Sequence, residues 1–207
     1  MAKKRKINKL RNFENIQSKK KSNNQILVNK EDYNQVGSFY FDPDDTKEIK
    51  SFIKNVQRLV RSSEEYKRYI SYLNSELELE SDSFMGNITS ESASLEFHHH
   101  PFTLYDIVEI IVNKHIMEDT DITSISIAEE VLKLHFDNLV GLVKLSATNH
   151  ELVHEQKLFI PHDMIFGNVN EFVNIYYDYI YDDMIDKYNK LINIDESKTY
   201  VNDFKIN

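Results

Sequence analysis

The stretches Leu95-Glu96-Phe97-His98-His99-His100-Pro101 and His150-Glu151-Leu152-Val153-His154 decide the fold of this chain. Residues 92–97 alternate in polarity as a half-buried strand does, and they run directly into three histidines. Residues 139–145 form a short apolar run with β-branched side chains, which predicts a second strand. The helix predicted next carries His150 and His154 on one face, because they are four residues apart. The order strand, strand, helix can bring both groups of histidines to one place.

The region before the first strand has the pattern of two amphipathic helices. Asp42-Pro43 predicts a helix start with proline at the first helical position, and Ser62 or Ser63 can cap a second helix. Each helix has apolar residues at the spacing of one buried face: Ile49, Phe52, Ile53, Val56, Leu59 and Val60, then Tyr66, Tyr69, Ile70 and Leu73. We expect a helical hairpin over residues 39–80, which serves packing or dimerisation and has no catalytic role.

Further helices are predicted between and after the two strands. Thr103-Leu104-Tyr105-Asp106 resembles a capping box and opens a helix to about Met117, and a box at residues 126–129 opens another through His135. A third box, at residues 148–151, would start the helix that carries His150 and His154. A strand at residues 157–160 and a long aromatic helix from about 170 to 192 complete the predicted elements.

Composition limits the kinds of site that this chain can build. It has 207 residues, 41% of them hydrophobic, which suits one domain with attached segments. It has no cysteine, so a disulfide framework, a cysteine nucleophile and a cysteine zinc site are excluded. Any metal would have to be held by His, Asp, Glu or Asn. Since no apolar run approaches the length of a membrane span, we expect no membrane partner and a cytoplasmic location.

Charge is distributed unevenly along the chain, whose net charge is -9. Residues 1–24 hold nine Lys/Arg and a single acid, Glu14. Such an arm is either a solvated, disordered tail or a flexible element that contacts phosphates. On the second reading, the arm binds DNA through Lys3, Lys4, Arg5, Lys6, Lys19, Lys20 and Lys21.

The histidine stretches with the strand at residues 140–145 resemble the HNH motif of ββα-metal nucleases, in particular those encoded by phages. The resemblance covers about residues 95 to 175. It implies a phage-encoded endonuclease that hydrolyses phosphodiester bonds of DNA in the host cytoplasm. It also implies one divalent metal ion (Mg, Mn, Ni or Zn), with His98, His150 and His154 as ligands and His99 as general base. Both roles suit imidazole, a common metal ligand that can accept a proton near neutral pH.

Some points of the resemblance stay open at the sequence level. The functional pair of the histidine triplet can be His98/His99 or His99/His100, and the first leaves the gap before Pro101 that the family normally has. The nearest counterpart of the family's middle Asn is Asn138. Asn138 could orient the base, or it could be an ordinary turn residue. Three further residues could support the site but are ordinarily structural: Glu96, His115 and His135.

The predicted fold is α+β and mostly helical, with a ββα-metal core, an inserted helix pair, an N-terminal helical hairpin and a long C-terminal helix. Its predicted parts are a basic arm (1–38), the hairpin (39–80), the HNH-like domain (88–193) and a tail (194–207). Residues 46–77 offer a surface for a homodimer. Besides the nuclease, two functions remain: a non-cleaving DNA- or partner-binding phage protein with a structural metal, and a structural virion component whose histidines are coincidental.

Overall fold

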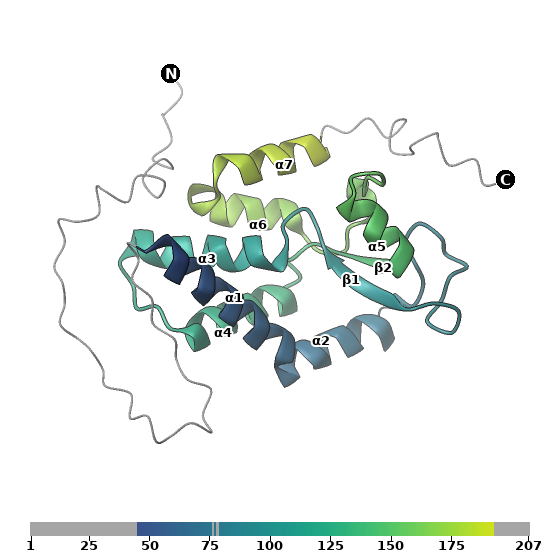
Figure 1. Ribbon diagram of the computed structural model, residues 1–207, viewed down its shortest axis with the longest axis horizontal. Helices are drawn as coiled ribbons and strands as arrows, with labels where there is room; N and C mark the ends of the chain where they lie inside the picture. The colour runs from purple at the N-terminus through teal and green to yellow at the C-terminus, as the bar shows by residue number, and fades with distance from the viewer. Residues whose placement is uncertain (1–44, 76, 78, 193–207) are drawn as a thin grey trace.

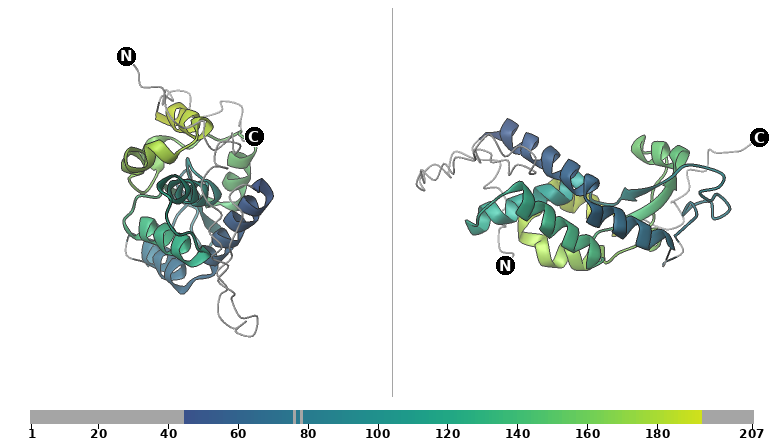
Figure 2. Two further views of the ribbon diagram at one scale, coloured as in Figure 1. Left: turned by 90° about the vertical axis from the view of Figure 1, so that its left-hand side faces the viewer. Right: turned by 90° about the horizontal axis from the view of Figure 1, so that it is seen from below.

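The computed structural model describes residues 45–75, 77 and 79–192, and all statements below concern these residues. A two-stranded sheet and helix α5 lie together at one end of the molecule, and the helices α1, α3, α4, α6 and α7 form the other end (Figure 1). Helix α2 runs along the side of the sheet opposite to α5 (Figures 1 and 2). The histidine stretches therefore lie beside a mainly helical body.

Helix α1 (Thr46–Ser62) begins later than predicted. Asp45 has extended backbone angles, and its side chain accepts hydrogen bonds from Lys47 N and Glu48 N, which makes it the N-cap. The predicted start at Asp42-Pro43 lies outside the described residues. The apolar face of α1 is buried, with Ile53 fully inaccessible, and it packs mainly against α4 and α3.

Helix α2 (Glu64–Ser75) begins where the sequence predicts, because the Ser63 hydroxyl accepts a hydrogen bond from Tyr66 N at 3.1 Å. The predicted hairpin is wrong in its geometry. A single residue separates the helices, too few for a reversal, and α2 continues away from the end of α1 instead of folding back along it (Figures 1 and 2). The packing role predicted for this region is confirmed, since Tyr69 and Leu73 are buried. The homodimer stays a prediction.

The sheet consists of β1 (Leu95–His99) and β2 (Leu142–Ser146), which pair antiparallel from Leu95 opposite Ser146 to His99 opposite Leu142. Beyond the last pair, His100 N donates to Gly141 O at 3.0 Å. A Cβ atom at Gly141 would lie 2.0 Å from the carbonyl oxygen of His100, so this close approach requires glycine. Glycine thus allows the chain to pair tightly at the histidine end of the sheet.

Two helices, α3 (Leu104–Glu118) and α4 (Ser124–Phe136), connect the strands, as predicted. The capping box of Thr103 and Asp106 is confirmed at the start of α3. The box predicted at residues 126–129 is wrong. Thr123 caps α4, and Ser126 is its reciprocal partner, with backbone-to-hydroxyl distances of 3.0 and 3.1 Å.

Helix α5 (Ala147–His154) follows β2 without a loop, so it starts earlier than the box predicted at residues 148–151. Ser146, the last residue of β2, is its cap and accepts from Asn149 N at 3.4 Å. The strand predicted at residues 157–160 is absent from the described residues. On the side of β2 away from β1, Leu142 instead exchanges two backbone hydrogen bonds with Phe166, both 2.8 Å. A short 3-10 helix, η3 (His162–Met164), precedes this bridge.

The long C-terminal helix predicted for residues 170–192 is divided into α6 (Val169–Tyr176), the 3-10 turn η4 (Tyr177–Tyr179) and α7 (Asp182–Ile192). Ile180 is extended and fully buried, which ends the helical run. The side chain of Asn113 in α3 donates to the carbonyl of Tyr179 at 2.5 Å and so satisfies a group that the interrupted helix leaves open. The aromatic stripe is nevertheless core, as predicted, with Phe172 and Tyr176 buried.

The predicted α+β, mostly helical fold class is confirmed. Both strands, the inserted helix pair and α5 occur in the predicted order, and one large apolar core joins α1, α2, α3, α4, α6 and α7. No described helix is long and apolar enough to cross a membrane.

Candidate functional site

Asp82 and Ser146 fix the start of α5 and thereby the position of its histidines. The buried carboxylate of Asp82 accepts from Ser146 N at 2.6 Å and from the side-chain amide of Asn149 at 2.9 Å. Burial opposes its ionisation, but the hydrogen bonds from Ser146, Met85 and Phe84 outweigh burial and lower the pKa of Asp82. An ionised Asp82 thus holds α5 to the end of β2.

Three of the predicted site residues converge between β1 and α5. One ring nitrogen from each of His98, His150 and His154 lies within 4.8 Å of the others. The Nε2 atoms of His150 and His154 are 3.0 Å apart, and the His98 ring centroid is 4.9 Å from that of His150 and 5.2 Å from that of His154. Nitrogens on a tetrahedral zinc ion, each about 2.0–2.1 Å from the metal, lie about 3.3 Å apart, which is close to the His150–His154 separation and shorter than the 4.8 Å limit of the whole cluster. The arrangement therefore suits a metal ion.

Glu96 is placed to orient one of these rings. Its carboxylate oxygen lies 3.4 Å from Nδ1 of His150. A proton on Nδ1 directed at this carboxylate leaves the lone pair on Nε2, the atom that faces His154. Metal-binding histidines commonly have such a carboxylate behind them, which fixes the tautomer and raises the basicity of the ligand.

The environment keeps two of the rings neutral at pH 7. Burial, with added repulsion from His150, His100 and His154, lowers the pKa of His98 to about 4. Burial and His154 also lower the pKa of His150, against the opposing effect of Glu96. Because a metal competes with protons for imidazole nitrogens, neutral rings are ready to bind an ion.

His99 points away from this cluster. Successive side chains of a strand face opposite sides, and His99 turns toward α2 and α4, where it is only 6% exposed. Its ring stacks on Tyr66, and its Nε2 lies 3.0 Å from Nε2 of His135. Burial, together with repulsion from His135, Arg61 and His98, lowers the pKa of His99 well below the usual value. Thus His99 is not part of the nitrogen cluster, in keeping with a role other than ligand.

The hydrogen bonds of His135 determine which nitrogen of His99 carries a proton. His135 Nδ1 lies 2.7 Å from the carbonyl oxygen of Val131, which can only accept, so the proton is on Nδ1. Burial lowers the pKa of His135 to about 4, so the ring is neutral at pH 7 and its Nε2 is an acceptor. His99 must then donate from Nε2. Its Nδ1 keeps a lone pair and can accept a proton.

The cluster and His99 line one pocket of about 410 Å³. Its walls come from the end of α1, the start of α2, β1, the start of α3 and α5, and include Arg61, Tyr66, His98, His99, Leu104 and His154. Arg61 lies close enough to His99 and His150 to depress the pKa of both. The pocket is thus lined by the nitrogen cluster, by His99 and by a cation that can attract phosphate.

The remaining sequence candidates lie elsewhere. The His100 ring is 6.1 Å from that of His98 and outside the nitrogen cluster, and burial lowers its pKa to about 4. His115 bonds to Glu130 Oε2 at 2.8 Å, away from the site. Asn138 has a left-handed backbone conformation (φ 54°) in the turn after α4. This fits the turn role, which was the alternative to the role of the family's middle Asn. The predicted DNA-binding Lys3, Lys4, Arg5, Lys6, Lys19, Lys20 and Lys21 lie outside the described residues.

Sequence reasoning missed Asp82, Arg61 and Tyr66 as parts of this region. Asp82 stands at the end of an acidic stretch, where nothing in the sequence distinguishes it from the other acidic residues. Arg61 gave a usable signal, because it is basic and stands at the end of an amphipathic helix. His135 was considered as a supporting group, but its contact with His99 depends on a separation of 36 residues that spacing does not reveal.

Comparison with known proteins identifies the family but no activity. No curated protein and no solved structure matches the chain. A family model described as bacteriophage G278-like virion protein matches residues 1–205, so the predicted phage origin is confirmed, while the nuclease resemblance stays a prediction. Since the match spans nearly all of the 207 residues, this chain belongs to the bacteriophage G278-like virion protein family.

Proposed function

We propose that this virion protein is a metal-dependent endonuclease that hydrolyses phosphodiester bonds of DNA. The observation that supports this most is the convergence of His98, His150 and His154 at a pocket that also contains His99 and Arg61. One imidazole on β1 and two on α5, the helix that follows β2, occupy the ligand positions that the HNH resemblance implies.

The donor set favours one kind of ion over another. Imidazole suits zinc, nickel and similar transition metals, whereas magnesium prefers oxygen ligands and retains water. Three protein ligands leave a coordination position open, as catalytic zinc sites do and structural ones usually do not. A bound ion would supply Lewis-acid stabilisation of the charge that develops on the phosphate and on the leaving oxygen.

His99 would act as the general base through Nδ1. A water oxygen forms the new bond to phosphorus while His99 Nδ1 takes a proton from that water. The bond from phosphorus to the 3′ oxygen breaks, and that oxygen receives a proton from solvent. The products are a 5′-phosphate and a 3′-hydroxyl. The charged side chain of Arg61 would attract the phosphate into the pocket.

The test is nicking of supercoiled plasmid with zinc, nickel, manganese or magnesium. We expect nicking with at least one ion and loss of it in His99→Gln and in His154→Ala. His162→Ala is the control, because His162 is an exposed histidine whose partner is Asn170, outside the pocket. Calorimetry should show that His99→Gln still binds the ion and that His154→Ala binds it weakly.

A second candidate function, a non-cleaving virion component, is favoured by the family description. The same experiment separates the two. Metal binding at His98, His150 and His154 with no nicking under any ion would overturn the nuclease proposal and favour the structural role. Equal nicking by wild type and His99→Gln would remove His99 as the base.

A further inference from the structure

The positive charge of α1 is gathered on one side of the helix. Five of its residues are basic and one, Glu48, is acidic, although the chain has a net charge of -9. The basic side chains recur every three or four residues, at Lys47, Lys50, Lys54, Arg58 and Arg61. At 100° per residue, these positions fall within an arc of roughly 80°.

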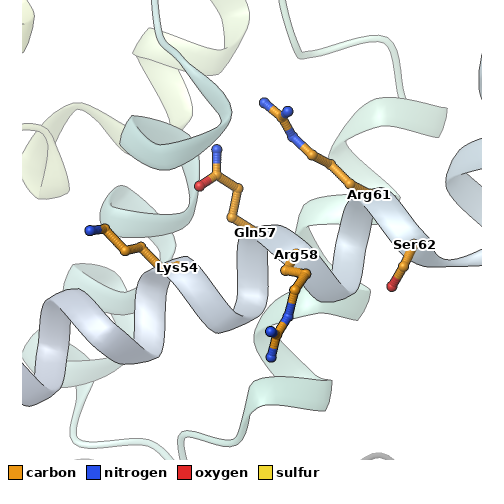
Figure 3. A pocket seen from close by; sticks show the side chains of 5 residues that line it. All are labelled: Lys54, Gln57, Arg58, Arg61 and Ser62. Atoms are coloured by element: carbon orange, nitrogen blue, oxygen red, sulfur yellow. The ribbon is translucent and has the colours of Figure 1, made fainter.

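This basic side of α1 faces away from the core. The buried residues of the helix, among them Ile53, Val56 and Val60, occupy the opposite arc and pack inside the molecule. Lys47, Lys54 and Arg58 are exposed. Figure 3 shows Gln57 and Arg61 extending to one side of α1, Lys54 extending toward the N-terminal end of the helix, and Arg58 extending to the other side.

The basic stripe leads directly to the candidate site. Lys54, Gln57, Arg58, Arg61 and Ser62 line an open depression of about 350 Å³ on α1 (Figure 3). Arg61 also lines the pocket that contains the histidine cluster, so the two surfaces are continuous. From Lys47 to Arg61 the stripe spans about 21 Å at 1.5 Å per residue.

The charges of this stripe are available to a ligand. Among the described residues, neither Lys54 nor Arg61 forms an ion pair, and Arg58 contacts only the amide oxygen of Asn55 at 3.3 Å. By contrast, Lys114 and Lys133 on α3 and α4 are paired with carboxylates. Unpaired, aligned cations beside a phosphodiesterase pocket suit a phosphate backbone, whose charges repeat at regular intervals.

We infer that the basic stripe of α1 is a nucleic-acid-binding track that guides one DNA strand into the pocket at Arg61. This inference rests on the proposed function, because the pocket indicates which polyanion occupies the track. Binding is to phosphates and is therefore independent of base sequence. The sequence predicted DNA contacts only for the N-terminal arm, and α1 adds a second contact with DNA.

The test measures DNA binding without cleavage, on the full chain in EDTA. The variant combines Lys47→Gln, Lys54→Gln and Arg58→Gln, which are exposed and outside the histidine pocket. Anisotropy of a labelled duplex of about 25 base pairs is followed from 50 to 200 mM NaCl. Three lost phosphate contacts should reduce the log–log salt slope by about 2–3 units and weaken binding at least about tenfold at low salt.

The matched control combines Lys133→Gln, Lys157→Gln and Lys190→Gln, which make the same change in net charge at exposed positions elsewhere. It should retain the wild-type slope. Equal losses in both triple variants would overturn the inference, because only net charge would then matter. Binding of the wild type to anionic lipid vesicles but not to DNA would overturn it too. The binding test does not measure cleavage, so its outcome is independent of the plasmid-nicking experiment. DNA binding through α1 together with no nicking of plasmid would contradict the proposed function and support the track.

Discussion

The contact between the Nε2 atoms of His99 and His135 determines whether His99 can act as a base. We predict that neutral His99 is protonated on Nε2 and neutral His135 on Nδ1, because the Val131 carbonyl accepts from His135 Nδ1. Long-range ¹H–¹⁵N correlation spectra of protein with ¹⁵N-labelled histidine distinguish the two tautomers. The reverse tautomer of His99 would place its proton on Nδ1 and exclude that atom as the acceptor.

Glu96 should tune metal affinity through His150. Replacing Glu96 with Gln removes the charge behind His150 Nδ1, and losses of such partners weaken metal binding by about 10–100-fold. Zinc calorimetry at pH 7.5 measures this. Glu151→Gln serves as the control, since it removes the same charge from an exposed residue next to His150 in the chain but not from the position beside Nδ1. If both variants had the same zinc affinity, any loss relative to the wild type would come from the change in net charge and not from the position of Glu96 beside His150.

The sequence predicted those residue positions that local spacing determines. His150 and His154 share a face because they are four residues apart in a helix, and the adjacent strands bring His98 to them. The tautomer of His99 could not be predicted, because it depends on His135, a residue of the inserted helix pair. The same holds for Arg61, which reaches the pocket only through the packing of α1.

The position of helix α5 depends on the buried carboxylate of Asp82. In Asp82→Ala, the Ser146 amide and the Asn149 side chain lose a charged acceptor in a site that is 1% exposed, so we expect a loss of about 2–4 kcal/mol of unfolding free energy. Urea unfolding measures it. Zinc affinity should fall as well, since α5 carries two ligands. Wild-type stability in the variant would show that α5 needs no such attachment, and Glu91→Ala, at an exposed position, is the control.

Elements with a strong internal pattern were predicted well, and their boundaries less so. The α3 start follows from Thr103 and Asp106 alone, which are local. The break before α7 depends on Asn113 reaching the Tyr179 carbonyl, and no residue near 180 is a helix breaker. Likewise, residues 157–160 have a strand composition, but Leu142 of β2 pairs with Phe166 instead. In both places the observed structure follows tertiary contacts and not the local sequence preference.

The whole molecule should lose stability in acid, because it buries neutral histidines. Burial lowers the pKa of His135 to about 4, whereas a histidine in the unfolded chain titrates near 6.5. The unfolded state therefore binds a proton that the folded state does not. This contribution is fully present above pH 6.5 and is lost as pH falls toward 4, by about 2 kcal/mol at pH 5. Buried His99 shifts stability in the same direction.

Urea unfolding in EDTA at pH 7.5 and pH 5.0 checks this prediction. The wild type should lose more free energy between the two values than His135→Phe, which cannot be protonated at that position. Identical pH dependence in both proteins would mean that His135 is protonated equally in the folded and unfolded states. The comparison is internal to each protein, so a change in absolute stability of the variant does not affect it.

If the three-histidine cluster makes this virion protein a nuclease, the rate of nicking must depend on the concentration of free metal ion. With the most active ion, the nicking rate of the wild type should saturate at the concentration where calorimetry shows one ion bound. In His154→Ala the half-saturating concentration should rise by at least the roughly 10–100-fold that loss of a hydrogen-bonding partner of a ligand causes, because one of the three ligands themselves is lost, while His162→Ala follows the wild type. Superimposable curves for His154→Ala and wild type, or nicking that persists in EDTA, would contradict the account.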